Sequence, residues 1–308
     1  APDVRIINDQ LYFLASKSNE KGTIYRTKDP LHKQFEIVGA PLQVWDPNLF
    51  QDDDGRVYIY WGCSNKFPIF GCELDQLSLM PLEEPRELIF EHEDTLGYER
   101  NGDNHFLPEP KTEMEKMIRM YMGTKPFIEG AWMTKHNGLY YLQYASPGTQ
   151  YNIYSDAVYV GKGPLGPFEI AKNNPFSYQP NGFITGAGHG STFLDTYGNW
   201  WHISTMRISV NHNFERRIGL WPAGFDEDGD LFCNNRYGDW PREILPGKQN
   251  PWEDPKWLLL SYGKTVNVSS YQNGFEGNKA SDENIRTWWS AQTNSEKEWL
   301  ELDLGHSC

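Results

Sequence analysis

The chain has 308 residues, a formal net charge of −14 at pH 7 and a mean hydropathy of −0.67. This charge argues against nucleic acids and anionic membranes as partners, because binding to phosphates requires clustered Lys and Arg side chains. No apolar run approaches the length of a membrane span, so we expect no membrane insertion. Aromatic residues make up 15% of the chain, including 12 Trp and 17 Tyr. Their flat rings suit both a protein core and the C–H faces of sugars.

The four cysteines, Cys63, Cys72, Cys233 and Cys308, are spread along the chain. They have neither CxxC spacing nor a His-linked zinc pattern, which argues against a metal cluster. The sequence alone leaves a disulfide between Cys63 and Cys72 open.

Four segments share one pattern, in which a short apolar strand, a turn with Asp, Asn or Gly, and an aromatic-rich strand follow one another. Asn-Gly, Asp-Gly and Gly-Asn turns between such runs are strong hairpin signals. Repeated hairpins at irregular spacing, each followed by further strands, predict an all-β fold of the β-propeller type. A β-sandwich with long loops is the alternative. The four hairpins are Val4–Ser16, Asn48–Cys63, Ala131–Ser146 and Ser191–Met206.

Helical composition is found in one segment, Pro110–Met120, which we interpret as an insertion between two blades. The acidic turns Asp52–Asp54 and Asp226–Asp228 lack the remaining ligands and the spacing of calcium loops, so we predict ordinary β-turns there.

A polar side chain stands just ahead of the first strand of each hairpin. The innermost strands of propeller blades all begin at the same end of the central axis, so these four side chains should converge. An isolated Asp-Pro is usually a cap or a turn, but four polar residues at equivalent places favour a site. Apolar surface raises the pKa of a carboxylic acid, so an acid in such a place, as expected for Glu129, can donate a proton near neutral pH. The four residues are Asp3, Asp46, Glu129 and His189.

Three stretches carry a resemblance to a known family: WDPNLFQDDDGRVYIYWG, IEGAWMTKHNGLYYLQYAS and GAGHGSTFLDTYGNWWHI. They resemble the third, fourth and fifth blades of family 43 of the glycoside hydrolases, which are five-bladed propellers that cleave arabinose, xylose or galactose linkages. The resemblance covers residues 1–245 and implies a carbohydrate substrate and no required cofactor. About four blades are then present.

The resemblance also assigns roles. Glu129 matches the general acid, and Asp46 matches the carboxylate that orients this acid and tunes its acidity. His189 matches an axial histidine that touches a water-coordinated calcium or sodium ion, although a core hydrogen bond would also explain it. Arg207 matches a substrate-binding arginine, for which Arg216 and Arg217 compete.

Further substrate contacts are expected from aromatic residues beside these positions, namely Trp45, Trp132 and Tyr151. The segments Asn101–Pro110 and Tyr151–Tyr154 are predicted to shape the subsites.

The sequence departs from the family at its general base, an Asp at the start of the first blade. The opening APDV resembles the second blade, so the first blade and the base would be missing, and Asp3 would line the rim of the pocket. In the other alignment Asp3 is itself the base. An inverting reaction requires acid and base carboxyl groups roughly 6.5 to 9.5 Å apart. We therefore expect this chain to hydrolyse nothing efficiently, unlike its full-length parent.

The remainder of the chain changes character after residue 245. Residues 246–262 are predicted to be a linker or propeller-closing segment. Residues 263–308 resemble the opening of a discoidin-type carbohydrate-binding domain, a β-sandwich that is cut short here. The family resemblance implies a secreted or periplasmic protein, although no signal peptide is visible in the chain.

Two other functions fit the same pattern. In one, the propeller binds carbohydrate without cleaving it, and the acids only donate or accept hydrogen bonds. In the other, the propeller cleaves fructans by a retaining reaction with an Asp nucleophile, and product stereochemistry would distinguish it from an inverting enzyme.

Overall fold

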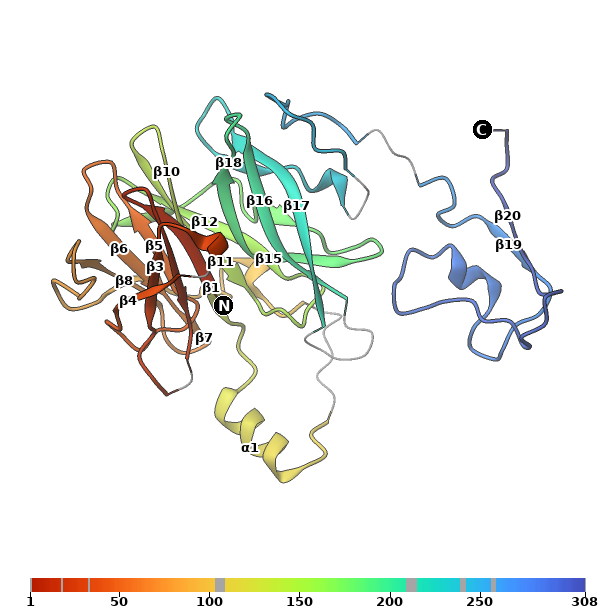
Figure 1. The fold of residues 1–308 in the computed structure, drawn as a ribbon. Coiled ribbons are helices and arrows are strands. Elements are labelled where there is room, and N and C mark those ends of the chain that lie inside the picture. The colour runs from red at the N-terminus through yellow and green to blue at the C-terminus, as the bar shows by residue number, and fades with distance from the viewer. Residues whose placement is uncertain are drawn as a thin grey trace.

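The computed structural model describes residues 2–17, 19–32, 34–102, 109–208, 215–238, 242–255 and 259–307. Its main body is built from four antiparallel sheets that follow one another along the chain and stand as the blades of a propeller (Figure 1). This arrangement confirms the predicted all-β propeller with four blades. The predicted truncated sandwich remains a prediction.

The first two sheets have four strands each. The first contains β1 (Pro2–Ile7), β2 (Gln10–Ala15), β3 (Ile24–Thr27) and β4 (Glu36–Gly39). The second contains β5 (Asn48–Gln51), β6 (Val57–Trp61), β8 (Ile69–Leu74) and β9 (Arg86–Ile89).

The third sheet is larger, because a short strand from the region of the second sheet joins it. It contains β7 (Cys63–Ser64), β10 (Ile128–His136), β11 (Leu139–Ser146), β12 (Ser155–Gly161), β13 (Phe168–Ile170) and β14 (Ser177–Tyr178). The fourth contains β15 (Thr185–Leu194), β16 (Trp200–Arg207), β17 (Arg216–Phe225) and β18 (Leu231–Cys233).

All four predicted hairpins are present as β1–β2, β5–β6, β10–β11 and β15–β16. The tight turn of the third hairpin is Asn137-Gly138, where both residues have positive φ, 49° and 79°. Two such residues in a row match the twist of the flanking strands, which explains why Asn-Gly predicted this hairpin correctly.

Neighbouring sheets bury apolar side chains between their faces. One core cluster lies between the first and second sheets and includes Ile7, Leu14 and Ile59. Another joins the second and third sheets through Tyr60 and Tyr144. Burial alternates along much of β1, whereas β6 and β11 are buried along nearly their whole length because both of their faces are covered.

One α-helix, α1 (Glu113–Met122), lies between β9 and β10 and projects from the body (Figure 1). Thr112 caps it through a capping box with Glu115, so the helix begins three residues after the predicted Pro110. None of the described helices has the length and apolar character needed to cross a membrane. The short 3-10 helices are η1 (Pro30–His32), η2 (Gly97–Glu99), η3 (Asn235–Tyr237) and η4 (Gly277–Ala280).

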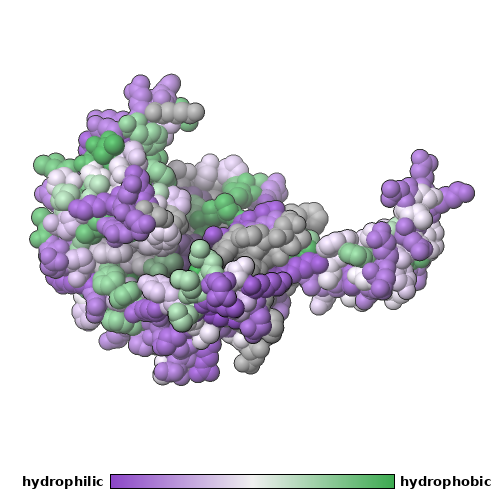
Figure 2. Space-filling view, turned by 90° about the horizontal axis from the view of Figure 1, so that it is seen from below, coloured by the Kyte–Doolittle hydropathy of each residue, from purple (hydrophilic) through white to green (hydrophobic). Residues whose placement is uncertain are grey.

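The C-terminal tail forms a lobe beside the main body (Figures 1 and 2). Its one described sheet pairs β19 (Thr265–Val268) with β20 (Leu300–Asp303). Such a two-stranded sheet is marginal by itself. Trp288 and Trp299 of this lobe are about half exposed, at 48% and 51%. The predicted linker 246–262 lies between body and lobe, and residues 256–258 of it lie outside the described part.

Beneath the inner strand β15 runs a buried chain of polar side chains. His202 Nε2 lies 2.9 Å from Asp156 Oδ2, and His202 Nδ1 lies 2.9 Å from Thr192 Oγ1. Thr192 donates to Gln143 Oε1 at 2.8 Å, and Gln143 donates to Thr134 at 3.0 Å. Burial raises the pKa of Asp156, an effect that the hydrogen bond from His202 opposes. Because each member has a partner, the network links the third and fourth sheets at little desolvation cost.

This network predicts the effect of a small substitution. In Gly190→Ala the added Cβ would lie within 2.5 Å of Asp156 Oδ2 and closer still to His202 Nε2. Since both groups are buried and bonded, we expect a loss of about 2–3 kcal/mol of unfolding free energy, measured by urea denaturation. Gly97→Ala is the matched control, because nothing lies within 4 Å of its Cβ. Equal stability of the two variants would contradict the packing described.

Candidate active site

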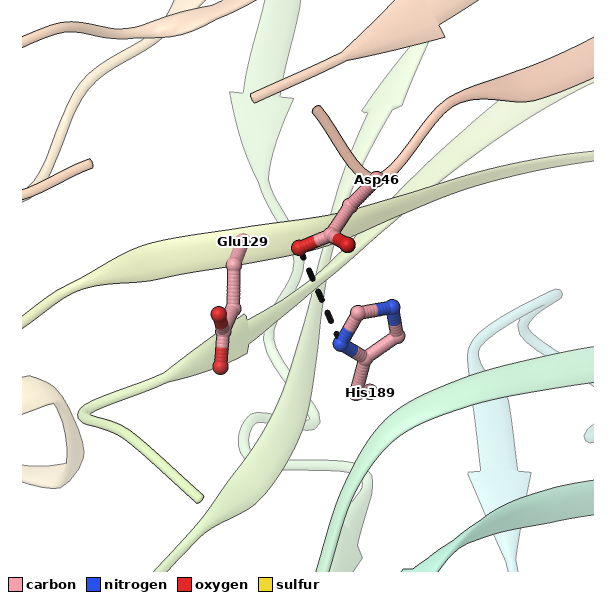
Figure 3. Close-up of side chains that lie close together, drawn as sticks. All are labelled: Asp46, Glu129 and His189. Atoms are coloured by element: carbon pink, nitrogen blue, oxygen red, sulfur yellow. Dashed lines mark ion pairs between the residues drawn. The ribbon is translucent and has the colours of Figure 1, made fainter. Parts of the chain in front are cut away.

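The side chains of Asp46, Glu129 and His189 lie close together (Figure 3). Asp46 lies in the loop before β5, Glu129 lies near the start of β10, and His189 lies within β15. One ligand-forming atom of each lies within 4.8 Å of the other two, and His189 Nδ1 lies 4.0 Å from Asp46 Oδ2. Glu129 follows Asp46 by 83 positions and His189 follows Glu129 by 60, yet the three side chains form one cluster, as the hairpin pattern predicted for them.

Irregular backbone directs these side chains inward. Asp46 and His189 have positive φ, 51° and 55°, as does Gly130 next to Glu129, at 66°. The pairing of β10 with β11 is bulged between Glu129 and Trp132, and β15 is bulged on both sides of Gly188. Bulges and left-handed residues turn side chains away from the regular pleat, and they concentrate at functional sites.

Two glycines, one on β10 and one on β15, leave room for rings to pack at this point. A Cβ on Gly130 would lie 2.8 Å from Cγ of His189, and a Cβ on Gly188 would lie 2.6 Å from the ring of Tyr154. At each glycine the space that a side chain would occupy is taken by a ring, that of His189 at Gly130 and that of Tyr154 at Gly188.

The carboxylate of Glu129 accepts a hydrogen bond at each oxygen. Tyr154 Oη donates to Oε1 at 2.5 Å, and Cys63 Sγ donates to Oε2 at 2.9 Å. Burial raises the pKa of both donors well above their ordinary values, and the charge of Glu129 raises them further. Sequence reasoning missed Cys63 and had placed Tyr154 only within a segment that shapes subsites.

Asp3 does not join this cluster, contrary to the expected convergence of four residues. It is buried between the first and second sheets, where Oδ2 accepts a hydrogen bond from Leu49 N at 2.6 Å. Arg5 Nε lies 3.9 Å from its other oxygen, and burial raises the pKa of Asp3 against the effect of that charge. Alternation along β1 is the reason, because Asp3 points to the same face as Arg5 and Ile7. Its role as base or rim residue remains a prediction.

The two tryptophans have different surroundings. Trp45, beside Asp46, is 46% exposed, so its ring is accessible to a ligand. Trp132 donates through Nε1 to Thr192 O at 2.9 Å, and the guanidinium of Arg5 lies 3.5 Å from its ring centre. These contacts connect three sheets through Trp132, and its predicted contact with substrate stays a prediction.

Arg207 ends β16, opposite Arg216 of β17. Its Nε is buried and has no hydrogen-bond partner among the described residues. Burial, and then the charge of Arg286 in the tail, lower the pKa of Arg207 to about 10. A buried donor without a partner is rare and is well suited to a sugar hydroxyl.

The other predicted contacts lie elsewhere. Tyr151 is buried. The predicted subsite loop Asn101–Pro110 falls largely on residues 103–108, outside the described part.

The three clustered residues also test whether an ion fits here. They offer two carboxylates and one imidazole, whereas calcium takes six to eight oxygen ligands. These residues are too few to hold calcium directly. Contact through a water shell, as predicted for His189, remains a prediction.

The cysteines Cys63, Cys72 and Cys233 are all free, so the disulfide left open by the sequence is not formed.

The family model described as "Glycosyl hydrolases family 43" matches residues 1–231, most of the chain. The chain belongs to glycosyl hydrolase family 43. The match ends before the tail, whose resemblance to a discoidin domain remains a prediction.

Named relatives fit this membership. The beta-D-galactofuranosidase xynD of Aspergillus niger is 25% identical over 213 residues, which is 65% of this chain and 51% of that protein. A beta-xylosidase of Xylanibacter ruminicola is 28% identical over 163 residues, 50% of this chain and 46% of that protein. The chain thus spans about half the length of these curated relatives. The crystal structure of a thermostable family-43 glycoside hydrolase has the same fold, with a TM-score of 0.58, 22% identity, and coverage of 81% of this chain and 78% of that one.

The close approach of β10 and β15 can be tested with two glycines of positive φ. Gly130→Ala should lower the unfolding free energy by about 1–3 kcal/mol more than Gly138→Ala, because Gly138 has open space around its Cβ and so reports the φ strain alone. The His189 ring resonances should also shift in the first variant and stay unchanged in the second, as measured by NMR. Similar behaviour of the two variants would contradict the packing of His189 on Gly130.

Proposed function

We propose that this chain is the catalytic propeller of a glycosidase that cleaves arabinose, xylose or galactose linkages in plant-type polysaccharide side chains or oligosaccharides. The observation that carries the proposal is the half-buried carboxyl group of Glu129 clustered with Asp46 and His189. Relatives named for beta-xylosidase and beta-D-galactofuranosidase activity support this substrate class. Like the family resemblance, the proposal implies a secreted or periplasmic protein.

In the proposed reaction Glu129 protonates the leaving oxygen. Asp46 is too close to act as the base of an inverting reaction, because an oxygen of each carboxylate lies within 4.8 Å of the other, while a water between acid and base needs roughly 6.5 to 9.5 Å. Its proximity suits a role in orienting the acid. Trp45 would stack on the sugar and Arg207 would bind a hydroxyl, in keeping with their exposure and free donor.

We further propose that the base is carried by an additional blade that packs against the outer face of the first sheet. The supporting observation is an unusually apolar face. Val4, Ile6 and Ile37 are 52%, 64% and 69% exposed. Cross-strand pairing puts all members on one side of the sheet, whereas a blade in a complete propeller is covered on both faces. The face consists of Val4, Ile6, Leu11, Phe13, Tyr25 and Ile37.

The additional blade makes a prediction about stability. In this chain Ile6→Lys should change the unfolding free energy by no more than about 0.5 kcal/mol, whereas Ile24→Ala, on the buried face, should cost about 2–5 kcal/mol. In a protein extended to any residues that its gene encodes upstream of Ala1, Ile6→Lys should become costly. The proposal would be contradicted if the gene encodes no such residues, or if Ile6→Lys leaves the unfolding free energy of the extended protein unchanged.

The reaction itself is tested with aryl xylosides and arabinofuranosides. Without a base the chain should release little phenol, but azide can attack the anomeric carbon from the open face while the leaving oxygen takes the proton of Glu129. We therefore expect azide to accelerate release, and Glu129→Gln to reduce the azide-dependent rate by about 10²-fold or more.

Binding supplies the control for that experiment. Calorimetry should give nearly equal affinity of the wild type and Glu129→Gln for xylo- or arabino-oligosaccharides, and about tenfold weaker binding by Trp45→Ala. Efficient azide-independent turnover that is lost in Glu129→Gln would show that a base is present in this chain. NMR of the first-formed anomer would then separate inversion from the retaining fructan-cleaving alternative.

A non-catalytic carbohydrate-binding propeller is the second candidate. The burial of Asp3 between sheets favours it, because the described cluster then contains no carboxylate placed as a base. Sugar binding without azide-dependent release would support this candidate.

A further inference from the structure

The carboxylate of Glu129 is held by two side chains that come from different elements. Cys63 approaches from β7 and donates to one oxygen, and Tyr154 approaches from the segment before β12 and donates to the other. The sequence pattern assigned neither donor a role toward the acid. A functional role for these two donors rests on the proposed role of Glu129 as an acid.

Backbone pairing determines the position of Cys63. The two-residue strand β7 pairs with β10, and its register sets Cys63 directly opposite Glu129 and Ser64 opposite Ile128. Direct partners on antiparallel strands have Cβ atoms roughly 4.5–5.5 Å apart, which is within reach of a thiol and a carboxylate. Asn65 extends the connection by donating to Lys125 O at 3.2 Å. The thiol therefore faces Glu129 because of the sheet itself.

Packing determines the position of Tyr154. Its side chain is fully buried, and its ring lies where a side chain at Gly188 would otherwise be. Its backbone N–H donates to Tyr151 O at 3.2 Å. The phenol can therefore reach Glu129 in one orientation only, and the short bond of 2.5 Å is typical of an O–H group donating to a charged oxygen.

Both groups are hydrogen-bond donors to Glu129. Burial, followed by the charge of Glu129, favours the protonated thiol and phenol by raising the pKa of each. Each oxygen of a carboxylate has about two acceptor sites, so one site per oxygen remains for the acidic proton. The two donors thereby fix the direction in which that proton can point.

We propose that Cys63 and Tyr154 are positioning residues of the general acid. As the proton leaves Glu129 for the leaving oxygen, the carboxylate gains negative charge, and hydrogen bonds to a charged acceptor are stronger than those to a neutral one. The two bonds therefore stabilise the transition state more than the ground state. The stabilisation applies only where the acid is needed, that is, for poor leaving groups.

The first test uses aryl glycosides of increasing leaving-group basicity, with azide present. Cys63→Ala and Tyr154→Phe should each slow the poorest leaving groups by about tenfold or more and change the best ones little. Cys63→Ser keeps a donor and should restore most of the rate. Cys72→Ala, at a buried thiol away from Glu129, is the control and should slow all leaving groups equally or not at all. A uniform loss across leaving groups in Cys63→Ala would overturn the positioning role.

The second test needs no turnover. The S–H stretching band of Cys63, assigned by its absence in Cys63→Ser, should lie below that of Cys72 in the infrared spectrum, because it donates to a carboxylate. It should move to higher frequency in Glu129→Gln. A band that does not move would overturn the contact whatever the activity. A band that moves in a protein without turnover under any condition would support the contact and contradict the proposed hydrolysis instead.

Discussion

The close approach of β10 and β15 is the constraint on which the rest of the centre depends. Gly130 of β10 leaves room for the imidazole of His189 on β15, and this allows the two strands to come so near. Gly188 of β15 leaves room for the ring of Tyr154, which comes from the segment before β12. The surroundings of Glu129 are thus set by close packing at two glycines, in addition to the hydrogen bonds of its side chain.

Burying polar side chains costs desolvation energy, and in the network beside β15 hydrogen bonds offset that cost. The chain from Asp156 through His202 and Thr192 to Gln143 is fully buried, and each link is a hydrogen bond of about ordinary length. The positive φ of His189 lies next to this network, because Gly190, the following residue, packs directly against His202 and Asp156. Asp46 has a different support, since its backbone N–H donates to Ser16 Oγ at 2.9 Å.

Much of this fold could be predicted from the sequence, because hairpins are local. A short apolar run, a turn and an aromatic-rich run predicted each of the four hairpins, and the polar residues ahead of them predicted three members of the cluster. The failure at Asp3 has a simple cause: the position of a residue along a strand was clear, but the face to which it points depends on register with Leu49 in another sheet. The contacts of Trp132 with Arg5 and Thr192 also depend on pairing between sheets, so the sequence did not predict them, and its contact with substrate stays a prediction.

Cys63 could not have been found in this way, because nothing near it in sequence marks it. Its partner lies 66 positions away and is selected by β7, a strand of only two residues. That small strand has a wider consequence. It fastens the start of β10 to the preceding blade, so the long segment that includes α1 does not itself have to position Glu129. This segment could therefore gain or lose residues during evolution while the side chain of Glu129 keeps its place.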